Sequence, residues 1–238
     1  MRAVNALTRK EIAQLVAQDI PDGSFVNLGI GIPTMVAEFL PPDRDIILHS
    51  ENGILGMGPR NPEMPPDLDL VNPSKEYIGL IQGASTCDSV MSFTMMRGGH
   101  LDLTVLGAFQ VSGRGDLANW QTDEVDAIPG VGGAMDLAIG AKRVFVMMEH
   151  TTRDGHPKIL ERCSFPLTGM AVVDRIYTDL AIIDVTAEGL VARALIDGLT
   201  LDQLQSATGV PLQLAPDHSV IKPRSPASQP KSATANGH

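Results

Sequence analysis

The chain has 238 residues, of which 43% are hydrophobic and 19% are charged, and its formal net charge is −10 at pH 7. This length allows one large α/β domain or two small ones with a substantial core, and the acidic balance argues against binding to nucleic acid or to an anionic membrane. No apolar run reaches the roughly 18 residues that a membrane span needs, and the N-terminal segment lacks the apolar core of a secretory signal, so a cytoplasmic location is expected.

Two cysteines, Cys87 and Cys163, lie far apart in the sequence and show no C-x-x-C spacing. Zinc sites usually show that spacing, and a disulfide framework is typical of short secreted chains with several cysteines. We therefore expect two buried free thiols, no disulfide and no bound metal.

The predicted elements begin with an amphipathic helix. Residues 8–11 (TRKE) form a capping box, and apolar residues then recur at helical spacing as far as Ile20. A short strand at 24–28 follows and leads into a glycine-containing loop. Beyond the loop, residues 35–40 favour a second helix with Pro33 in its first turn.

The middle of the chain alternates between strand-like and helix-like segments. Residues 89–96 and 134–141 have helical patterns. Apolar runs bounded by turn residues predict strands at 46–48, 103–111, 144–148, 171–173 and 181–185. Such alternation predicts an α/β domain with a largely parallel or mixed sheet and helices on both faces.

The C-terminal part of the domain predicts a hairpin and a last helix. Residues 180–186 and 190–195 flank a short turn, as the two strands of a hairpin do. A second capping box begins at Thr200, and Gly209 is the expected stop of the helix that follows.

Two segments predict irregular structure. Residues 60–73 contain four prolines and predict a surface loop. Residues 216–238 are rich in Pro, Ser, Ala, Lys and Asn and lose apolar periodicity, which predicts a disordered tail. The folded domain is therefore expected to span residues 1–215.

Four glycine-containing clusters stand out, at residues 29–31, 53–58, 97–100 and 130–133. Glycine permits positive φ and close approach of a ligand to the backbone, so such loops after strands often line ligand crevices. The first cluster does not complete a dinucleotide-binding motif, because Thr34 replaces its third glycine and no suitable acidic residue follows about 20 positions on. A nicotinamide-dependent dehydrogenase is therefore disfavoured.

Glu51 is a single carboxylate at the end of an apolar run, followed by glycines at positions 53, 56 and 58. A carboxylate shielded from water in a glycine-lined pocket is more nucleophilic and can attack an acyl carbon to form a mixed anhydride. Backbone N–H groups of nearby glycines then stabilise the developing oxyanion. The alternative is a turn acid that accepts hydrogen bonds from backbone amides. From spacing alone, both interpretations of Glu51 stay open.

Seven short motifs follow one another along the chain, at 27–33 (NLGIGIP), 50–53 (SENG), 56–59 (GMGP), 97–100 (RGGH), 115–120 (GDLANW), 132–137 (GGAMDL) and 166–169 (PLTG). In this order they resemble the beta subunit of the family I 3-oxoacid CoA-transferases, and the resemblance covers roughly residues 8–215. It implies the α/β three-layer sandwich of CoA-transferases, a fold of the NagB/RpiA-like type.

The resemblance also implies a site and a reaction. In that family the glutamate of the SENG motif, here Glu51, is the nucleophile of a ping-pong transfer from succinyl-CoA to a 3-oxoacid, through a glutamyl-CoA thioester. Asn27 and Lys75 match positions beside the catalytic pocket. Gly132 or Gly133 matches a loop that lines the CoA channel and offers an amide to the oxyanion. Coenzyme A is a substrate, so no cofactor and no metal are implied, but a partner is: the CoA-transferase alpha subunit, which supplies most contacts to CoA.

Within the family, residues 108–112 and 120–133 look more like bacterial 3-oxoadipate transferases than like acetoacetate transferases. The loop 72–75 (NPSK) departs from the usual Asn-Ala-Gly-Lys pattern. The acceptor expected is therefore 3-oxoadipate, with two alternatives: the beta subunit of a succinyl-CoA:acetoacetate transferase, or a non-catalytic partner subunit in which Glu51 is structural.

Overall fold

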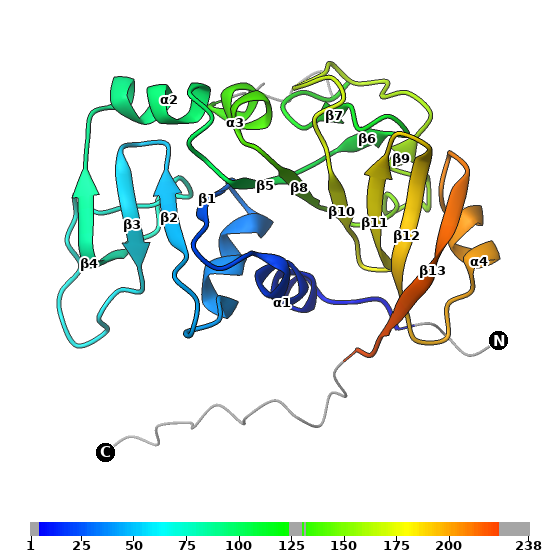
Figure 1. Cartoon of the computed structure of the whole chain (residues 1–238), viewed down its shortest axis with the longest axis horizontal. Helices are drawn as coiled ribbons and strands as arrows, with labels where there is room; N and C mark the ends of the chain where they lie inside the picture. The colour runs from blue at the N-terminus through cyan, green and yellow to red at the C-terminus, as the bar shows by residue number, and fades with distance from the viewer. Residues whose placement is uncertain (1–4, 124–129, 131, 224–238) are drawn as a thin grey trace.

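The computed structural model describes residues 5–123, 130 and 132–223. Within them, ten strands form one sheet in the spatial order β13-β12-β11-β10-β8-β5-β1-β2-β3-β4 (Figure 1). Their bounds are Phe25–Leu28 (β1), Ile47–Ser50 (β2), Ile54–Gly58 (β3), Gly79–Thr86 (β4), Leu103–Gly107 (β5), Val144–Met147 (β8), Arg175–Tyr177 (β10), Ala181–Thr186 (β11), Gly189–Ile196 (β12) and Leu212–Ile221 (β13). A smaller sheet holds β7 (Leu117–Ala118), β6 (Gln110–Ser112) and β9 (Ile159–Leu160) in that order.

The centre of the large sheet is parallel and its flanks are largely antiparallel. β10, β8, β5, β1 and β2 run parallel to their neighbours. The pairs β2/β3, β3/β4, β10/β11 and β11/β12 are antiparallel, whereas β12 and β13 pair in parallel. This confirms the predicted mixed sheet, and it places the carboxyl ends of β1, β2, β5 and β8 at one edge.

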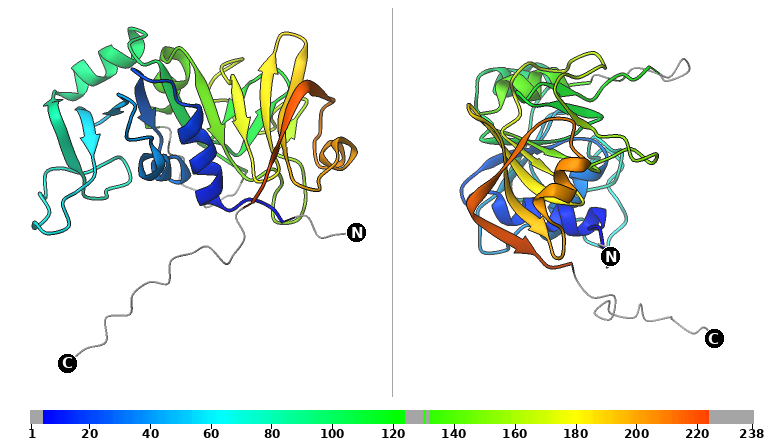
Figure 2. Two further views of the ribbon diagram at one scale, coloured as in Figure 1. Left: turned by 60° about the horizontal axis from the view of Figure 1, so that its bottom comes forward. Right: turned by 90° about the vertical axis from the view of Figure 1, so that its right-hand side faces the viewer.

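Helices cover both faces of the large sheet, as predicted (Figures 1 and 2). α1 (Arg9–Asp19) and the 3₁₀ helix η1 (Ile32–Phe39) pack together on one face. On the opposite side lie the pair α2 (Ser89–Arg97) and α3 (Ala134–Gly140), together with the small sheet and α4 (Leu201–Ser206). Among the helices of the described residues, none is long and apolar enough to cross a membrane.

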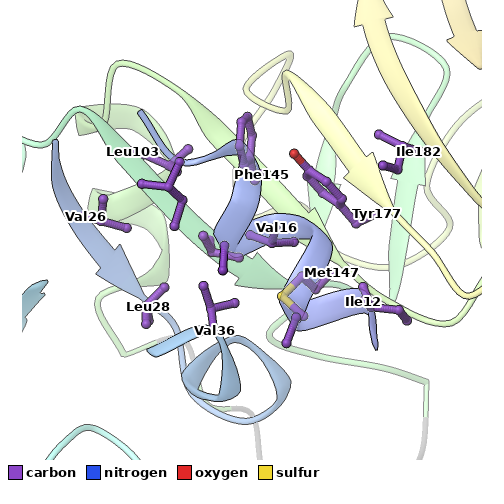
Figure 3. Packing of buried hydrophobic residues seen from close by; sticks show 14 of the residues in the cluster. Ile12, Val16, Val26, Leu28, Val36, Leu103, Phe145, Met147, Tyr177 and Ile182 are labelled. Carbon is purple, nitrogen blue, oxygen red and sulfur yellow. The ribbon is translucent and has the colours of Figure 1, made fainter. Parts of the chain in front are cut away.

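Alternation along the strands builds a separate apolar core on each face. Phe145 and Met147 of β8 point toward α1, whereas Val144 and Val146 point toward the other layer. Figure 3 shows the first core, where Val16 of α1 and Val36 of η1 lie among the strand residues. The chain therefore folds as three layers, because every second residue of a central strand contributes to a different core.

Both predicted capping boxes are present. Thr8 Oγ1 accepts a hydrogen bond from the backbone N–H of Glu11 at 3.3 Å, and the Glu11 carboxylate accepts one from the backbone N–H of Thr8 at 2.8 Å. Thr200 and Gln203 make the same reciprocal pair at the start of α4. The local signals for these helix starts were sufficient because each is satisfied by residues three positions apart.

Two strand predictions were wrong in detail. The run 103–111 divides between two sheets: β5 ends at Gly107, whose carbonyl accepts a hydrogen bond from Asn119 Nδ2 at 3.1 Å, and β6 starts at Gln110. Residues 171–173 are irregular instead of a strand. Ala171 has a φ of 50°, and the backbone N–H groups of Val172 and Val173 both donate to the carbonyl of Gly115.

The predicted start of the tail was also wrong. β13 runs to Ile221, and its second half pairs with β12 in the register Ala194↔Ser219, Leu195↔Val220 and Ile196↔Ile221. Pro216 lies where the register of this pair shifts, a position where proline is tolerated in a strand. Residues 224–238 of the predicted tail lie outside the described residues.

The predicted proline-rich segment 60–73 is an exposed loop apart from its last residues. Cys87 and Cys163 are free thiols, as predicted, but half-buried instead of buried. Burial raises the pKa of Cys163 to about 11. Its thiolate is therefore scarce near neutral pH, and the residue is a poor nucleophile.

Candidate active site

Glu51 directly follows β2 and stands at the carboxyl edge of the parallel strands. A tight turn fixes its backbone: the N–H of Gly53 donates to the carbonyl of Ser50 at 3.0 Å. Gly53 is required there because its φ is 101° and a Cβ atom would overlap the carbonyl oxygen of Cys87. Asn52 Nδ2 donates to the carbonyl of Val71 at 2.8 Å and ties the turn to the 60–73 loop.

The Glu51 carboxylate has no hydrogen bond or ion pair with any of the described residues, although it is half-buried. A turn acid would accept backbone hydrogen bonds, so the structural interpretation of Glu51 loses its main support. Two predicted site glycines lie against the carboxylate. A Cβ atom on Gly133 would come within 3.3 Å of Glu51 Cδ and closer still to Oε2, and one on Gly132 would lie 3.7 Å from Oε1.

A cavity of about 630 Å³ opens beside Glu51. Glu51 and the two glycines 132 and 133 line one end of it, together with the loop that follows β1. Apolar residues from the ends of β5 and β8 line its middle: Leu106, Ala108, Phe109, Met147 and Met148. Three charged residues complete the lining: Arg9, Glu149 and Lys158. A crevice outside the carboxyl ends of parallel strands is the usual ligand site of an open α/β sheet.

Asn27 lies in the middle of the sheet beneath the Glu51 turn and is 1% exposed. Its Nδ2 donates to His49 Nδ1 at 3.1 Å, so the His49 proton resides on Nε2, which donates to Ser92 Oγ at 2.9 Å. Ser92 Oγ in turn lies 3.4 Å from the carbonyl of Ser50. The structure thus places Asn27 outside the cavity lining, in a buried chain of hydrogen bonds that ends one residue before Glu51.

Lys75 is exposed at the tip of the turn 72–76 and does not line the cavity with Glu51. Its φ is 62°, and Asn72 holds the turn by accepting hydrogen bonds from the N–H groups of Ser74 and Glu76. Ser74 Oγ accepts a weak bond of 3.4 Å from the N–H of Gly31, which joins the turn to the first glycine cluster.

No pattern in the sequence indicated that Arg9, Glu149 and Lys158 meet. Arg9 was part of a capping box, and the other two lie about 140 residues further on in an apolar context. The pairing of β6 with β9, and an isolated bridge between Thr151 and Pro157, fold Lys158 back over the end of β8. Three residues of the glycine-rich segment, Ile128, Pro129 and Val131, lie outside the described residues. Among those described, no group of three His, Cys, Asp or Glu side chains is placed to hold a metal ion.

Comparisons with known proteins agree with this geometry. The family model for coenzyme A transferases matches residues 9–207. The beta subunit of the 3-oxoadipate CoA-transferase of Acinetobacter baylyi is 56% identical over 87% of this chain and 95% of the relative. The subunit of the same name from Pseudomonas putida is 53% identical over 89% of this chain and 99% of the relative.

A solved structure shares the fold at low sequence identity. The apoenzyme of an acyl-CoA transferase from Escherichia coli O157:H7 superposes with a TM-score of 0.71 at 18% identity, over 90% of this chain. The chain spans less than half, 43%, of that longer protein. The match of the family model over most of the chain, with relatives more than 50% identical along nearly their full length, shows that this chain belongs to the coenzyme A transferase family.

Proposed function

We propose that the chain is the beta subunit of a succinyl-CoA:3-oxoadipate CoA-transferase and that Glu51 is its nucleophile. The observation that carries the proposal is the Glu51 carboxylate itself, which has no partner among the described residues and faces a cavity between glycine and apolar residues. The names of the relatives at 56% and 53% identity support the choice of acceptor.

The proposed reaction has two matching halves. A Glu51 oxygen attacks the thioester carbon of succinyl-CoA, the C–S bond breaks, and CoA thiolate leaves behind a succinyl-glutamyl anhydride. The thiolate then attacks the glutamyl carbonyl, which forms a glutamyl-CoA thioester and releases succinate. The acceptor carboxylate runs the same steps in reverse and leaves as its CoA thioester. Coenzyme A is a substrate, and the chemistry needs no further cofactor.

The surroundings of Glu51 suit this sequence. Gly132 and Gly133 let the backbone approach the carboxylate closely, so an oxyanion formed there has amide groups within reach. The apolar middle of the cavity lowers the local water content, and an anhydride in such a place hydrolyses slowly. Neither feature is needed for a turn acid.

The partner in this proposal is the alpha subunit of the transferase. Both CoA and a dicarboxylic acid are anions, whereas this chain has a net charge of −10. A favourable field for these substrates therefore requires positive charge from another polypeptide in addition to the few cations of the cavity. Asn27 and Lys75 stay predictions as site residues: Asn27 acts on Glu51 through the backbone, and Lys75 lies where a partner or the CoA chain reaches it.

The test uses the chain co-purified with its alpha subunit. Succinyl-CoA is added, the glutamyl thioester is reduced with borohydride, and the Glu51 peptide is examined by mass spectrometry. We expect a mass change at Glu51 that corresponds to reduction of its carboxyl to an alcohol. The Glu51→Gln variant should lose turnover by at least about a thousandfold, as expected when a covalent nucleophile is removed.

Glu63→Gln provides the matched control, because Glu63 lies in the exposed 60–73 loop and outside the cavity. This variant should trap the adduct and turn over like the unmodified complex. An unmodified Glu51 peptide in an assembled, CoA-binding complex would instead identify a non-catalytic subunit. Rates with 3-oxoadipate and with acetoacetate as acceptors then decide between the two transferase activities.

A further inference from the structure

Three charged side chains meet at one end of the cavity although they are distant in sequence. Arg9 is the first residue of α1, Glu149 follows the end of β8, and Lys158 directly precedes β9. Among the described residues that line the cavity, the remaining charged one is Glu51. The cavity therefore has a reactive carboxylate and, separately, a cluster that contains two cations.

Arg9 and Glu149 neutralise each other. Arg9 Nη2 donates to Glu149 Oε1 at 2.8 Å, and this bond holds the pKa of Glu149 below its usual range. Both side chains remain substantially exposed, at 59% and 46%. The pair fixes the wall beside Lys158 but leaves no net charge of its own.

Lys158 is different, because its ammonium group makes no hydrogen bond or ion pair with any described residue, although the side chain is half-buried. Burial lowers its pKa, Arg9 lowers it further, and Glu149 and Asp179 act in the opposite direction. A charge that is partly desolvated and incompletely balanced gains strongly from a bound anion. The three donors of the ammonium group are thus available to a ligand that enters the cavity.

The distance between the two ends of the cavity suits a short diacid. In the sheet, β8 is separated from β2 by the steps β8-β5, β5-β1 and β1-β2, or about 14 Å at a strand spacing of about 4.8 Å. Glu51 extends from the end of β2, and Lys158 lies over the end of β8, so their side chains occupy part of this span. The lining between them is apolar: Leu106, Ala108 and Met147.

We propose that Lys158 binds the distal carboxylate of the acyl group and so selects dicarboxylic over monocarboxylic acids. The inference rests on the proposed function, since it takes Glu51 as the reacting end of the same cavity. One carboxylate would lie at Glu51 for acyl transfer, the methylene chain would cross the apolar floor, and the second carboxylate would accept hydrogen bonds from the Lys158 ammonium. The Arg9–Glu149 pair positions this end without binding the ligand.

The experiment compares two acceptors that differ at one end. 3-Oxoadipate carries a carboxylate where 3-oxohexanoate carries a methyl group, and both have the same reacting 3-oxoacid end. In a ping-pong reaction, kcat/KM for the acceptor reports the half-reaction in which that acceptor reacts. We expect Lys158→Met, in the complex with the alpha subunit, to lower kcat/KM for 3-oxoadipate about 10- to 100-fold, the usual effect of losing a charged hydrogen bond.

The same variant should change kcat/KM for 3-oxohexanoate less than about threefold, and Lys158→Arg should recover most of the activity with the diacid. Lys10→Met is the control, because Lys10 lies one position from Arg9 on α1 but is exposed and outside the cavity. Trapping of Glu51 with succinyl-CoA and with butyryl-CoA tests the same carboxylate on the donor side.

Equal losses with both acceptors would overturn the inference, since Lys158 would then act on the shared part of the substrates or on the fold. Unchanged kinetics in Lys158→Met would overturn it as well. A failure of the proposed function looks different: Glu51 would stay unlabelled in the unmodified complex, whatever residue stands at position 158, and the inference would fall with it.

Discussion

The contact between Gly133 and Glu51 depends on a single hydrogen atom in place of a side chain. Gly133 has a φ of −84°, which any residue adopts, so the backbone itself does not require glycine. What requires it is the Glu51 carboxylate, which lies where a Cβ atom would be. Alanine at position 133 must therefore displace the carboxylate without straining the backbone.

We predict that Gly133→Ala lowers kcat about 100-fold, because a displacement of about 1 Å at a reacting group has effects of that size. The midpoint of thermal unfolding should stay within about 2 °C of the unmodified chain, since the φ is unstrained. Steady-state rates of the complex and thermal unfolding of the same preparation measure the two quantities. A parallel loss of activity and stability would show that Gly133 has a packing role instead.

Residue-level patterns predicted Glu51 and the two glycines near it because their sequence neighbourhoods already carry the information. Glu51 ends a strand and is followed by glycines, and both features are local. The placement of Asn27 was less accessible. Its strand was predicted, but which way its amide points depends on the pairing of β1 with β2, which brings Asn27 opposite His49. No spacing rule reports a partner that lies 22 residues away.

At the scale of elements, two buried histidines join parts of the fold. His49 of β2 bonds to Ser92 of α2, and His150, after β8, lies 3.0 and 2.9 Å from the hydroxyls of Thr178 and Thr208. Both side chains are almost completely buried. Burial lowers the pKa of each histidine from 6.5 to about 4, with a further contribution from Lys158 at His150.

These shifts predict a loss of stability in mild acid. Between pH 6.5 and 4 the unfolded chain binds protons at both histidines that the folded chain does not bind, so the free energy of unfolding falls as the pH falls through this window. Each histidine should contribute about 2 kcal/mol of this loss between about pH 7 and pH 5. The loss is therefore absent above the range in which the unfolded histidines titrate.

Urea unfolding at about pH 7 and about pH 5 measures the effect, and His49→Gln and His150→Gln identify its source. Each variant has one fewer titrating group and should show a smaller difference between the two pH values, even if it is less stable at neutral pH. Variants that keep the full pH dependence would place its origin in other groups, such as the carboxylates of the surface.

Elements whose ends are set locally were predicted best. The capping boxes of α1 and α4 and the hairpin of β11 and β12 are all closed by contacts between near neighbours. The predictions failed where a distant segment decides the outcome. The 103–111 run leaves the large sheet after Gly107 because Ala118 and Lys158 offer hydrogen bonds to the chain beyond it. An apolar pattern alone carries no information about which sheet a strand joins.

On the scale of the whole molecule, the fold class followed from the alternation of strands and helices, but the charged end of the cavity did not. Arg9, Glu149 and Lys158 come from the start of α1, the end of β8 and the start of β9, and they meet because three layers close around one sheet edge. In the sequence each is an ordinary charged residue. Their proximity is a property of the topology, and only the structure can supply it.

The C-terminal strand allows a prediction about the whole domain. Residues 216–221 add the second half of β13, the ion pair between Arg193 and Asp217, and a backbone hydrogen bond of 2.8 Å from Asp197 to Ile221. Ile221 also packs against the core on the α1 face. A chain that ends at Ala215, the boundary that composition predicted, loses all of these contacts at once.

We expect this truncation to lower the free energy of unfolding by roughly 2 kcal/mol, or about 4–8 °C in the unfolding midpoint for a domain of this size. A chain that ends at Pro223 keeps the whole of β13 and should unfold at the same temperature as the full chain. Thermal unfolding of the three chains at one concentration makes the comparison. Equal midpoints for the chains ending at 215 and 223 would mean that the second half of β13 adds nothing to the fold, in which case composition marked the functional end of the domain correctly.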